Sequence, residues 1–161
     1  MKKAFVLFLT SLMLLVAGLV HAAPVQTNQA MVKGLSLSDS MDKVEKVMGK
    51  PYRIGNYYAE SYWGGYQDDM YEYPGVNFVF VKGKMIKIIL DSPQASLDNG
   101  VKVGTPMNTV VKVFGSDYSV NTKSEMVYDY VTDPITYGIG KLTFVIGQDT
   151  VKKILIEREK G

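Results

Sequence analysis

The chain has 161 residues, of which 18 are basic and 16 acidic, and it contains one histidine and no cysteine. The lack of cysteine excludes disulfides and thiolate metal sites. Because the single histidine, His21, lies in an apolar N-terminal segment, the rest of the chain also lacks the groups for Ser-His-Asp or Cys-His catalysis and for imidazole zinc sites.

Residues 1–22 are predicted to form a secretory signal peptide. Two lysines precede an almost unbroken apolar run over residues 4–20, which small residues follow. We expect cleavage after Ala22, because cleavage one residue later would place Pro24 directly after the cut. The alternative is an uncleaved membrane anchor, since about 17 apolar residues lie at the lower limit of a bilayer span. No cysteine follows the run to carry a lipid, so we expect an exported protein, periplasmic or extracellular, without a stable membrane anchor.

The charge of the chain does not indicate a nucleic-acid or anionic-lipid partner. Two of the 18 basic residues and none of the 16 acidic residues lie in the signal segment, which leaves a net charge of zero for the remainder. Without a basic excess or a clustered stripe of Lys and Arg, we expect no binding to nucleic acid.

A loose N-terminal arm is predicted over residues 23–33, and a short helix within residues 39–49. The apolar residues at positions 41, 44, 47 and 48 recur with the spacing of one helical face. Asp39 is expected to cap the start of the helix, and Gly49 is expected to end it in a left-handed conformation.

The segment over residues 56–71 is rich in tyrosine and contains the only tryptophan, beside two adjacent glycines. Tyrosine and tryptophan supply a large contact area at low entropic cost and are typical of binding surfaces. The alternative is that these side chains cover the sheet or the seam between two parts of the chain. The predicted contact residues are Tyr58, Tyr62, Trp63, Tyr66 and Tyr71.

Asp68, Asp69 and Glu72 form the densest acidic group. Carboxylates bind calcium, but the spacing lacks the alternating ligands and central glycine of a calcium loop, so a solvated turn is predicted. Glu60 and Asp68 could act as an acid/base pair, as in glycoside hydrolysis, but nothing in the sequence fixes their separation. We therefore predict no enzyme, no catalytic or metal-binding residue and no cofactor.

An antiparallel hairpin is predicted over residues 76–90. Two runs rich in β-branched and aromatic residues, 76–81 and 85–90, flank a tight turn at Gly83. One or two less clearly defined strands are expected upstream of them. Residues 92–99, a polar stretch that contains Pro93, are predicted to form a linker.

The second part of the chain repeats this pattern at one constant offset in residue number. Thr105 is the expected helix cap, Pro106 the first helical residue and Gly115 the end of the helix, and a second hairpin spans residues 141–156. The offset is applied without a gap. It pairs Met41 with Met107, Val44 with Val110, Gly49 with Gly115, Tyr62 with Tyr128, Tyr71 with Tyr137, Phe78 with Phe144 and Ile88 with Ile154.

The predicted fold class is α+β, with two tandem copies of a unit made of one helix and a three- or four-stranded antiparallel sheet. Repeat 1 covers residues 34–91 and repeat 2 covers residues 100–157, and a tail follows at residues 158–161.

Residues 101–115, with the sequence VKVGTPMNTVVKVFG and tyrosine-rich strands after it, resemble the helical opening of the SmpA/OmlA (BamE-like) outer-membrane assembly domains. Tandem copies of such a unit are the architecture of the β-lactamase inhibitor proteins, and PepSY-type inhibitory domains share the same coarse pattern. The resemblance implies helices packed on antiparallel sheets and a role in protein–protein binding. The chain lacks the lipidation cysteine of the assembly lipoproteins and the cysteine pair of the inhibitors, so neither specific role transfers.

The sequence thus favours an exported, non-catalytic module that binds an envelope or extracellular protein, of the inhibitor or envelope-assembly type, through the aromatic segment of repeat 1. The alternative is an envelope glycan- or peptidoglycan-binding protein in which tyrosine and tryptophan stack on sugar rings. A self-associating structural protein is a third possibility.

Overall fold

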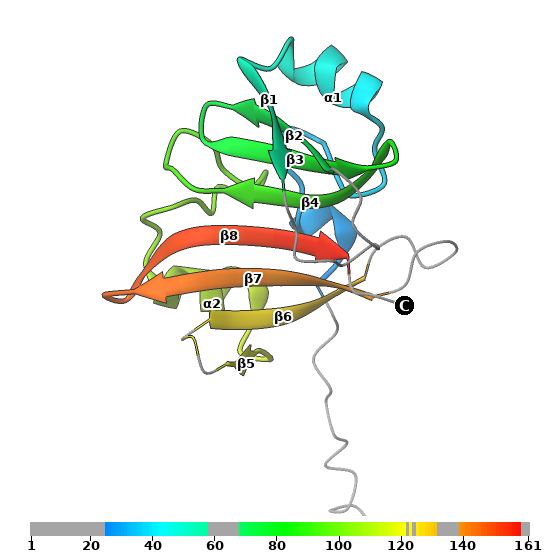
Figure 1. Cartoon of the computed structure of the whole chain (residues 1–161). Helices are drawn as coiled ribbons and strands as arrows, with labels where there is room; N and C mark the ends of the chain where they lie inside the picture. The colour runs from blue at the N-terminus through cyan, green and yellow to red at the C-terminus, as the bar shows by residue number, and fades with distance from the viewer. Residues whose placement is uncertain (1–24, 58–67, 122, 124, 132–138, 159–161) are drawn as a thin grey trace, which may run out of the picture.

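The computed structural model describes residues 25–57, 68–121, 123, 125–131 and 139–158. These residues form an α+β fold with one antiparallel sheet of eight strands, in the order β1-β2-β3-β4-β8-β7-β6-β5. The elements in chain order are η1 (Thr27–Gln29), α1 (Met41–Met48), β1 (Arg53–Tyr57), β2 (Asp68–Tyr73), β3 (Val76–Val81), β4 (Lys84–Leu90), α2 (Met107–Phe114), β5 (Ser119–Val120), β6 (Glu125–Val131), β7 (Ile139–Gly147) and β8 (Thr150–Arg158). Helix α2 lies behind the sheet in Figure 1, and α1 contributes Val44 to the same core.

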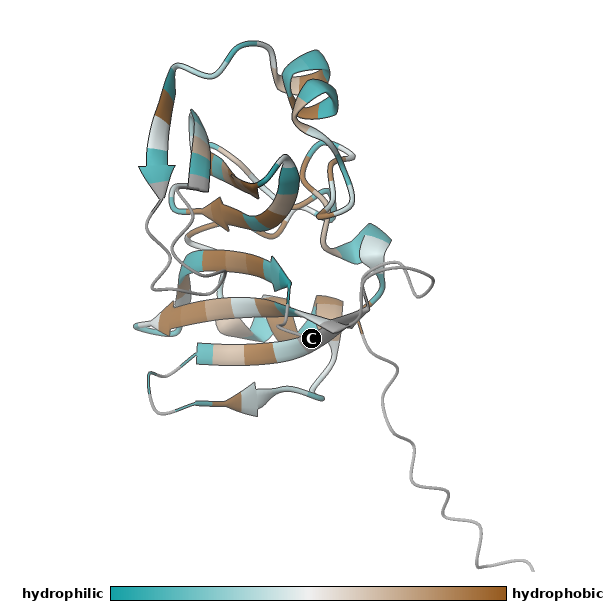
Figure 2. Cartoon of the chain, turned by 45° about the vertical axis from the view of Figure 1, so that its right-hand side comes forward, coloured by the Kyte–Doolittle hydropathy of each residue, from teal (hydrophilic) through white to brown (hydrophobic). Residues whose placement is uncertain are grey.

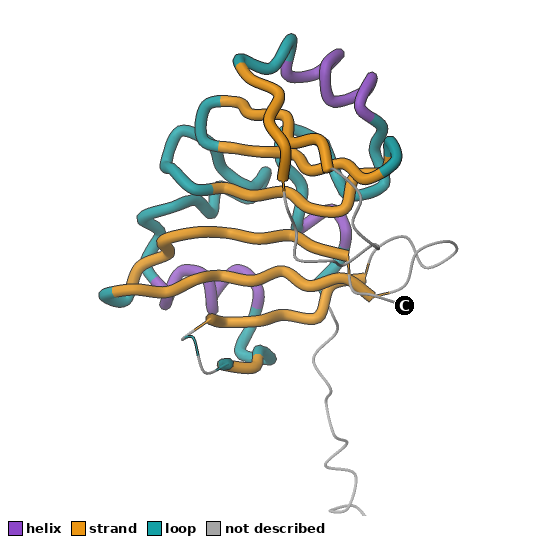
Figure 3. The backbone as a smooth tube through the Cα atoms, in the orientation of Figure 1, coloured by secondary structure: helices purple, strands orange, loops and turns teal. Residues whose placement is uncertain are grey.

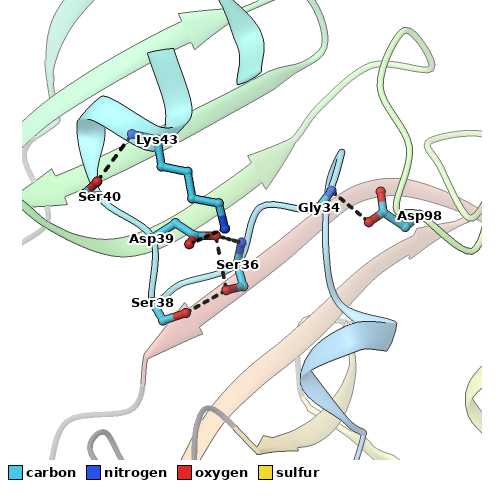
Figure 4. A network of polar contacts seen from close by, with 7 residues as sticks. All are labelled: Gly34, Ser36, Ser38, Asp39, Ser40, Lys43 and Asp98. Atoms are coloured by element: carbon cyan, nitrogen blue, oxygen red, sulfur yellow. Dashed lines mark hydrogen bonds and ion pairs between the residues drawn. The ribbon is translucent and has the colours of Figure 1, made fainter. Parts of the chain in front are cut away.

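The two helices form where the apolar spacing predicts them, but their caps are shifted by one residue. Ser40, not Asp39, is the N-cap of α1, and its hydroxyl accepts a hydrogen bond from the Lys43 N–H at 3.3 Å. The Asp39 carboxylate turns back to accept the Ser36 N–H at 2.8 Å, and it pairs with the Lys43 ammonium at 2.7 Å (Figure 4). The predicted role of Asp39 is therefore wrong, because its side chain closes the loop before the helix.

The start of α2 shows the same shift. Pro106 is the N-cap and has an extended backbone, and the Thr105 hydroxyl accepts the Lys102 N–H at 2.9 Å instead of capping the helix. Both helices end at the predicted glycines, Gly49 and Gly115, whose φ angles of 81° and 88° favour glycine. Their ψ angles of −169° and −178° are extended, so the predicted left-handed helical conformation is not the one adopted.

The main core lies between the helices and the sheet. Phe114 of α2 packs with ring-centroid distances of 5.3 Å to Phe144 and 5.6 Å to Tyr128. One fully buried line of side chains crosses the sheet from β3 to β6 on this face. It consists of Phe78, Ile88, Ile156, Leu142 and Tyr128.

Two tyrosines tie the sheet to the helix ends. The Tyr73 hydroxyl donates a hydrogen bond to the carbonyl of Gly49 at 2.9 Å, and the Tyr128 hydroxyl donates one to the carbonyl of Gly115 at 2.8 Å. In the register, Tyr73 lies opposite Val76, and Tyr128 lies opposite Leu142.

These contacts correct the ungapped alignment. Val76 and Leu142 keep the constant offset of the helices and hairpins, whereas Tyr73 and Tyr128 are closer together in the sequence. Tyr128 therefore makes in its half the contact that Tyr73 makes in the other, and the constant offset does not hold between these two tyrosines. The residues Tyr62 and Tyr137 themselves lie outside the described part of the chain.

Both predicted hairpins are confirmed, as β3–β4 and β7–β8. Their two-residue turns have positive φ angles at both central positions, 49° and 75° at Lys82 and Gly83, and 52° and 56° at Gln148 and Asp149. This is the conformation of type I′ turns, whose twist matches that of the paired strands.

The two halves of the chain, α1 with β1–β4 and α2 with β5–β8, lie side by side in one sheet. Four residue pairs between β4 and β8 join them, among them Ile88 with Ile156 and Leu90 with Ile154 (Figures 1 and 3).

The described residues of the predicted arm are packed and not loose, and the predicted linker, which lies between β4 and α2, also contributes to the core. Val25, Ala30 and Val32 are buried in the core, as is Leu97 in the expected linker. The two segments also bind each other, since the Asp98 N–H donates to the Met31 carbonyl at 2.9 Å. The apolar residues of these two segments stand in short runs without the spacing of a helix or a strand. The sequence pattern therefore did not predict that they are buried.

The tyrosine contacts with the helix ends can be tested by removing single hydroxyl groups. Tyr128→Phe and Tyr73→Phe should each lower the free energy of unfolding by about 1 kcal/mol, because each loses one partly buried hydrogen bond. Urea denaturation measures the change. Tyr118→Phe is the control, because Tyr118 contacts the Tyr128 ring through its own ring, and it should change stability by less than about 0.5 kcal/mol. Equal effects for all three variants would contradict the assignment.

Tyr128 also makes the free energy of unfolding depend on pH in the alkaline range. Burial, with a smaller contribution from Tyr118, raises the pKa of Tyr128 to about 12. Above the ordinary pKa of about 10, the unfolded chain loses this proton while the folded chain keeps it, so the free energy of unfolding falls as the pH rises from 10 to 12. We expect a loss of about 1 to 3 kcal/mol over this range. Urea denaturation of wild type and Tyr128→Phe should show a shallower fall in the variant, and identical slopes would contradict this role.

Candidate functional site

The candidate site lies on the face of the sheet opposite the helices, where neighbouring strands place their residues in rows. Side chains of a strand alternate between the two faces, so the residues between the core positions point away from α1 and α2. Three neighbouring strands, β6, β7 and β8, place rows of residues on this face. We call the following residues the β6–β8 patch. Its rows are Glu125, Val145 and Lys153, then Val127, Thr143 and Leu155, then Lys141 and Glu157.

The β6–β8 patch has three apolar side chains around the central Thr143 and charged residues in its outer rows. Val127, Val145 and Leu155 are half-buried, and Thr143 between them is buried. Figure 2 shows hydrophobic residues along these strands. Apolar residues with a polar rim are typical of protein-binding surfaces.

One corner of the patch is held by an ion pair across the seam between the halves. The Lys87 ammonium lies 2.9 Å from the Glu157 carboxylate, and both side chains are partly shielded from water. Lys141 is the cross-strand neighbour of Glu157 on its other side. Opposite charges on adjacent strands support this register of the sheet.

Val79 and Ile89 extend the apolar surface beyond the seam and are buried, although they do not belong to the core under the helices. The outermost residues of this face are polar. The buried carboxylate of Glu72 accepts the Tyr52 hydroxyl at 3.0 Å and lies 3.5 Å from Arg53 Nε. The hydrogen bond to Glu72 raises the pKa of Tyr52.

The acidic group lies in a strand and not in the predicted solvated turn. Asp68, Asp69 and Glu72 belong to β2, where alternation sends Asp69 to the opposite face from Glu72. Within the described residues, no three side chains of the metal-binding types cluster. The possible acid/base partner Glu60 lies outside the described residues.

Four of the five predicted contact residues, Tyr58, Tyr62, Trp63 and Tyr66, lie outside the described residues. Tyr71 lies in β2 on the helix-covered face and is 6% exposed, with its ring 5.4 Å from that of Phe80 in an edge-on contact. Burial, followed by the nearby carboxylate of Glu45, raises the pKa of Tyr71. In this structure Tyr71 is a core residue, which corrects its prediction as a contact.

The residues of the β6–β8 patch are not aromatic, so the aromatic clustering that predicts a contact surface in the sequence does not mark them. A signal for it was present, since the run from Val151 to Ile156 and the run from Lys141 to Ile146 place apolar residues on both faces of their strands. Strands with two apolar faces indicate a sheet that is covered, or available for binding, on both sides.

A separate groove of about 650 Å³ lies between the start of α2 and the β7–β8 turn. Its backbone is fixed, because the Met107 N–H donates to the Asp149 carbonyl at 2.8 Å. The lining is mainly apolar, with Lys112 and Asp149 as its charged residues, and it contains no cluster of groups suited to catalysis.

No protein-family model matches the chain, and comparison with curated protein sequences finds no match. Its fold is similar to that of two solved structures. One is an extracellular protein containing an SCP domain from Bacillus anthracis str. Ames, with 12% identity and a TM-score of 0.50 over 76% of this chain and 44% of the other. The second is a cysteine-rich secretory protein from Staphylococcus aureus, with 10% identity and a TM-score of 0.52 over 85% of this chain and 50% of the other. The chain thus spans about half the length of these proteins.

A proposed β-lactamase inhibitor protein from Streptococcus mutans aligns with 14% identity over 74% of this chain and 83% of the other, with a TM-score of 0.31. This score is too low to establish a shared fold. Because no family model matches, membership of the SmpA/OmlA family is not shown. Among the described helices, none is long and apolar enough to cross a membrane.

Neighbouring residues of β8 distinguish the core from the β6–β8 patch. Ile156→Ala should lower the free energy of unfolding by about 2 to 5 kcal/mol, because Ile156 is fully buried beneath the helices. Leu155→Ala, on the other face, should cost less than about 1.5 kcal/mol. Urea denaturation compares the two. Equal losses would mean that Leu155 is packed like a core residue, which would remove it from the candidate site.

Proposed function

We propose that the chain is an exported, non-catalytic protein-binding module, and that the β6–β8 patch contacts its partner. The observation that carries the proposal is the group of half-buried apolar side chains of this patch, Val127, Val145 and Leu155, which lies around Thr143 on the face opposite the helices and has charges of both signs in its outer rows. Such a group gains free energy when a partner removes it from water, at about 25 cal/mol per Å² of apolar area.

The charged corners would determine which partner binds and in which orientation. Glu125 and Lys153 stand at the two ends of one row, and Lys141 and Glu157 are neighbours in another, so the rim has no single sign. A partner with a complementary alternation of charge is favoured over a uniformly acidic or basic one. This is consistent with the expected exclusion of nucleic acid.

Three finer features belong to the same proposal. The aromatic residues Tyr58, Tyr62, Trp63 and Tyr66 contribute a second contact region, which the chain enters after β1 and leaves before β2. The two halves are copies of one unit. This is supported by the glycine that ends each helix and by the two hairpin turns, which are separated by the same number of residues as the two helices. Export to the periplasm or the extracellular space is supported by the apolar segment at residues 4–20.

The test is a pull-down from envelope and culture-medium fractions of the source cells, with the purified chain immobilised. The patch variant is Val145→Lys/Leu155→Lys, which places charge among the apolar side chains. The matched control is Val47→Lys, an exposed apolar residue of α1. We expect the patch variant to retain at least tenfold less partner, because a buried unpaired charge costs more than about 1.4 kcal/mol. The control should retain the partner.

Further arms separate the remaining possibilities. Loss of the partner after protease treatment of the fractions supports a protein, whereas survival indicates a glycan and contradicts the proposal. Trp63→Ala/Tyr66→Ala tests the aromatic segment independently of the patch. If the patch variant binds as well as wild type while circular dichroism shows both folded, the β6–β8 patch is not the contact surface.

A further inference from the structure

The groove between the start of α2 and the β7–β8 turn is formed by two segments that are fixed to each other (Figure 1). Besides the bond from the Met107 N–H to the Asp149 carbonyl, the Val151 N–H donates to the Thr105 carbonyl at 2.9 Å. Two backbone hydrogen bonds therefore hold the start of the helix against the turn. The volume of about 650 Å³ lies within the range of pockets that bind small ligands.

One part of the groove is apolar and another part is charged. Met107 and Val111 stand four residues apart on one face of α2, and both are half-buried against the core. Asn108 and Lys112 form the next row of the helix and are exposed, as is Asp149 on the turn. An apolar lining with a few polar groups that fix the orientation of a ligand is the usual composition of a binding pocket.

The two charged side chains of the groove are not used by the fold. In the part of the chain that the structure describes, neither the Lys112 ammonium nor the Asp149 carboxylate takes part in an ion pair. Both charges therefore remain available to groups of opposite sign on a ligand.

Asp149 also occupies a backbone position that favours glycine. Its φ angle is 56°, and the corresponding residue of the β3–β4 turn is Gly83, with a φ angle of 75°. Turns of this type prefer glycine at that position, and aspartate tolerates it better than most residues but less well than glycine. A side chain that is kept in such a conformation at a cost in stability indicates a role beyond folding.

The first half of the chain carries different residues at the corresponding positions, at the constant offset of the helices and hairpins. The changes from the first half to the second are Asp42 to Asn108, Glu45 to Val111 and Gly83 to Asp149. In α1, Asp42 stands four residues before Lys46, where opposite charges stabilise each other. In α2 this acidic neighbour is missing, and the groove has its acidic group on the turn instead.

We propose that the groove binds an apolar dipeptide with both ends free, with its ammonium at Asp149 and its carboxylate at Lys112. Asp149 is held beside Met107, and Lys112 is the fifth residue after Met107, which is about 7.5 Å further along the helix axis. Two residues of an extended peptide span about 7 Å, so the two ends reach both charges. The apolar side chains of the dipeptide then lie on Met107 and Val111.

The test is an NMR titration of the purified chain with leucyl-leucine as the probe. We expect saturable shifts of the amide signals of Met107 and Asp149, with a Kd of about 1 mM or below. N-acetyl-leucyl-leucine lacks the ammonium, and leucyl-leucine amide lacks the carboxylate. Each of these peptides should bind about threefold to fivefold more weakly, which is the effect of losing one exposed ion pair.

Two variants assign each charge of the peptide to its partner. Asp149→Asn should bind leucyl-leucine as weakly as wild type binds the acetylated peptide, and acetylation should cause no further loss. Lys112→Gln should show the same relation to the amidated peptide. If either residue had a purely structural role, its variant would weaken the binding of all three peptides equally. Lys46→Gln, the corresponding exposed lysine of α1, is the matched control and should bind like wild type.

Two results would overturn the inference. One is the absence of saturable binding of leucyl-leucine to wild type. The other is equal binding of the free and capped peptides, which would mean that the groove takes an internal segment of a longer chain. The inference does not rest on the proposed function, because the groove and the β6–β8 patch share no residue. Val145→Lys/Leu155→Lys should therefore bind leucyl-leucine like wild type, whatever the result of the pull-down.

Discussion

The pairing of β4 with β8 is the constraint on which the rest of the structure depends. It joins two half-sheets of four strands into one sheet, with Ile88 against Ile156 on the covered face and Lys87 against Glu157 on the other. Because both halves hold their helix on the same face, the pairing builds one continuous core, and no described helix covers the other face. The pairing of β4 with β8 therefore creates both the continuous core and the candidate binding surface.

The face opposite the helices differs from an ordinary solvated sheet face. In an antiparallel sheet with one wet side, alternate residues are expected to be polar. Here Val127, Val145 and Leu155 interrupt that pattern, and charges stand around them. Similar folds occur within two larger proteins, one extracellular and one secretory, of which this chain spans about half.

Features set by local sequence could be predicted, and features set by distant contacts could not. Helices and hairpins followed from apolar spacing and turn residues, but Asp39 and Thr105 were misassigned as caps, because either residue can bond to the loop before the helix as well as to the helix itself. The matching contacts of Tyr73 and Tyr128 with the helix ends became visible only from their hydrogen bonds. The β6–β8 patch required the strand register, which no single strand encodes.

The seam between β4 and β8 also has a consequence for the newly made chain. Its paired residues, such as Leu90 and Ile154, are far apart in the sequence, whereas each hairpin closes over a two-residue turn. Local hairpins therefore form early, and the seam must await the last strand of the chain. Until β8 is available, β4 is a bare apolar edge that can pair with the β4 strand of another incomplete chain. The risk of aggregation during synthesis is thus concentrated in the interval before residue 158 emerges.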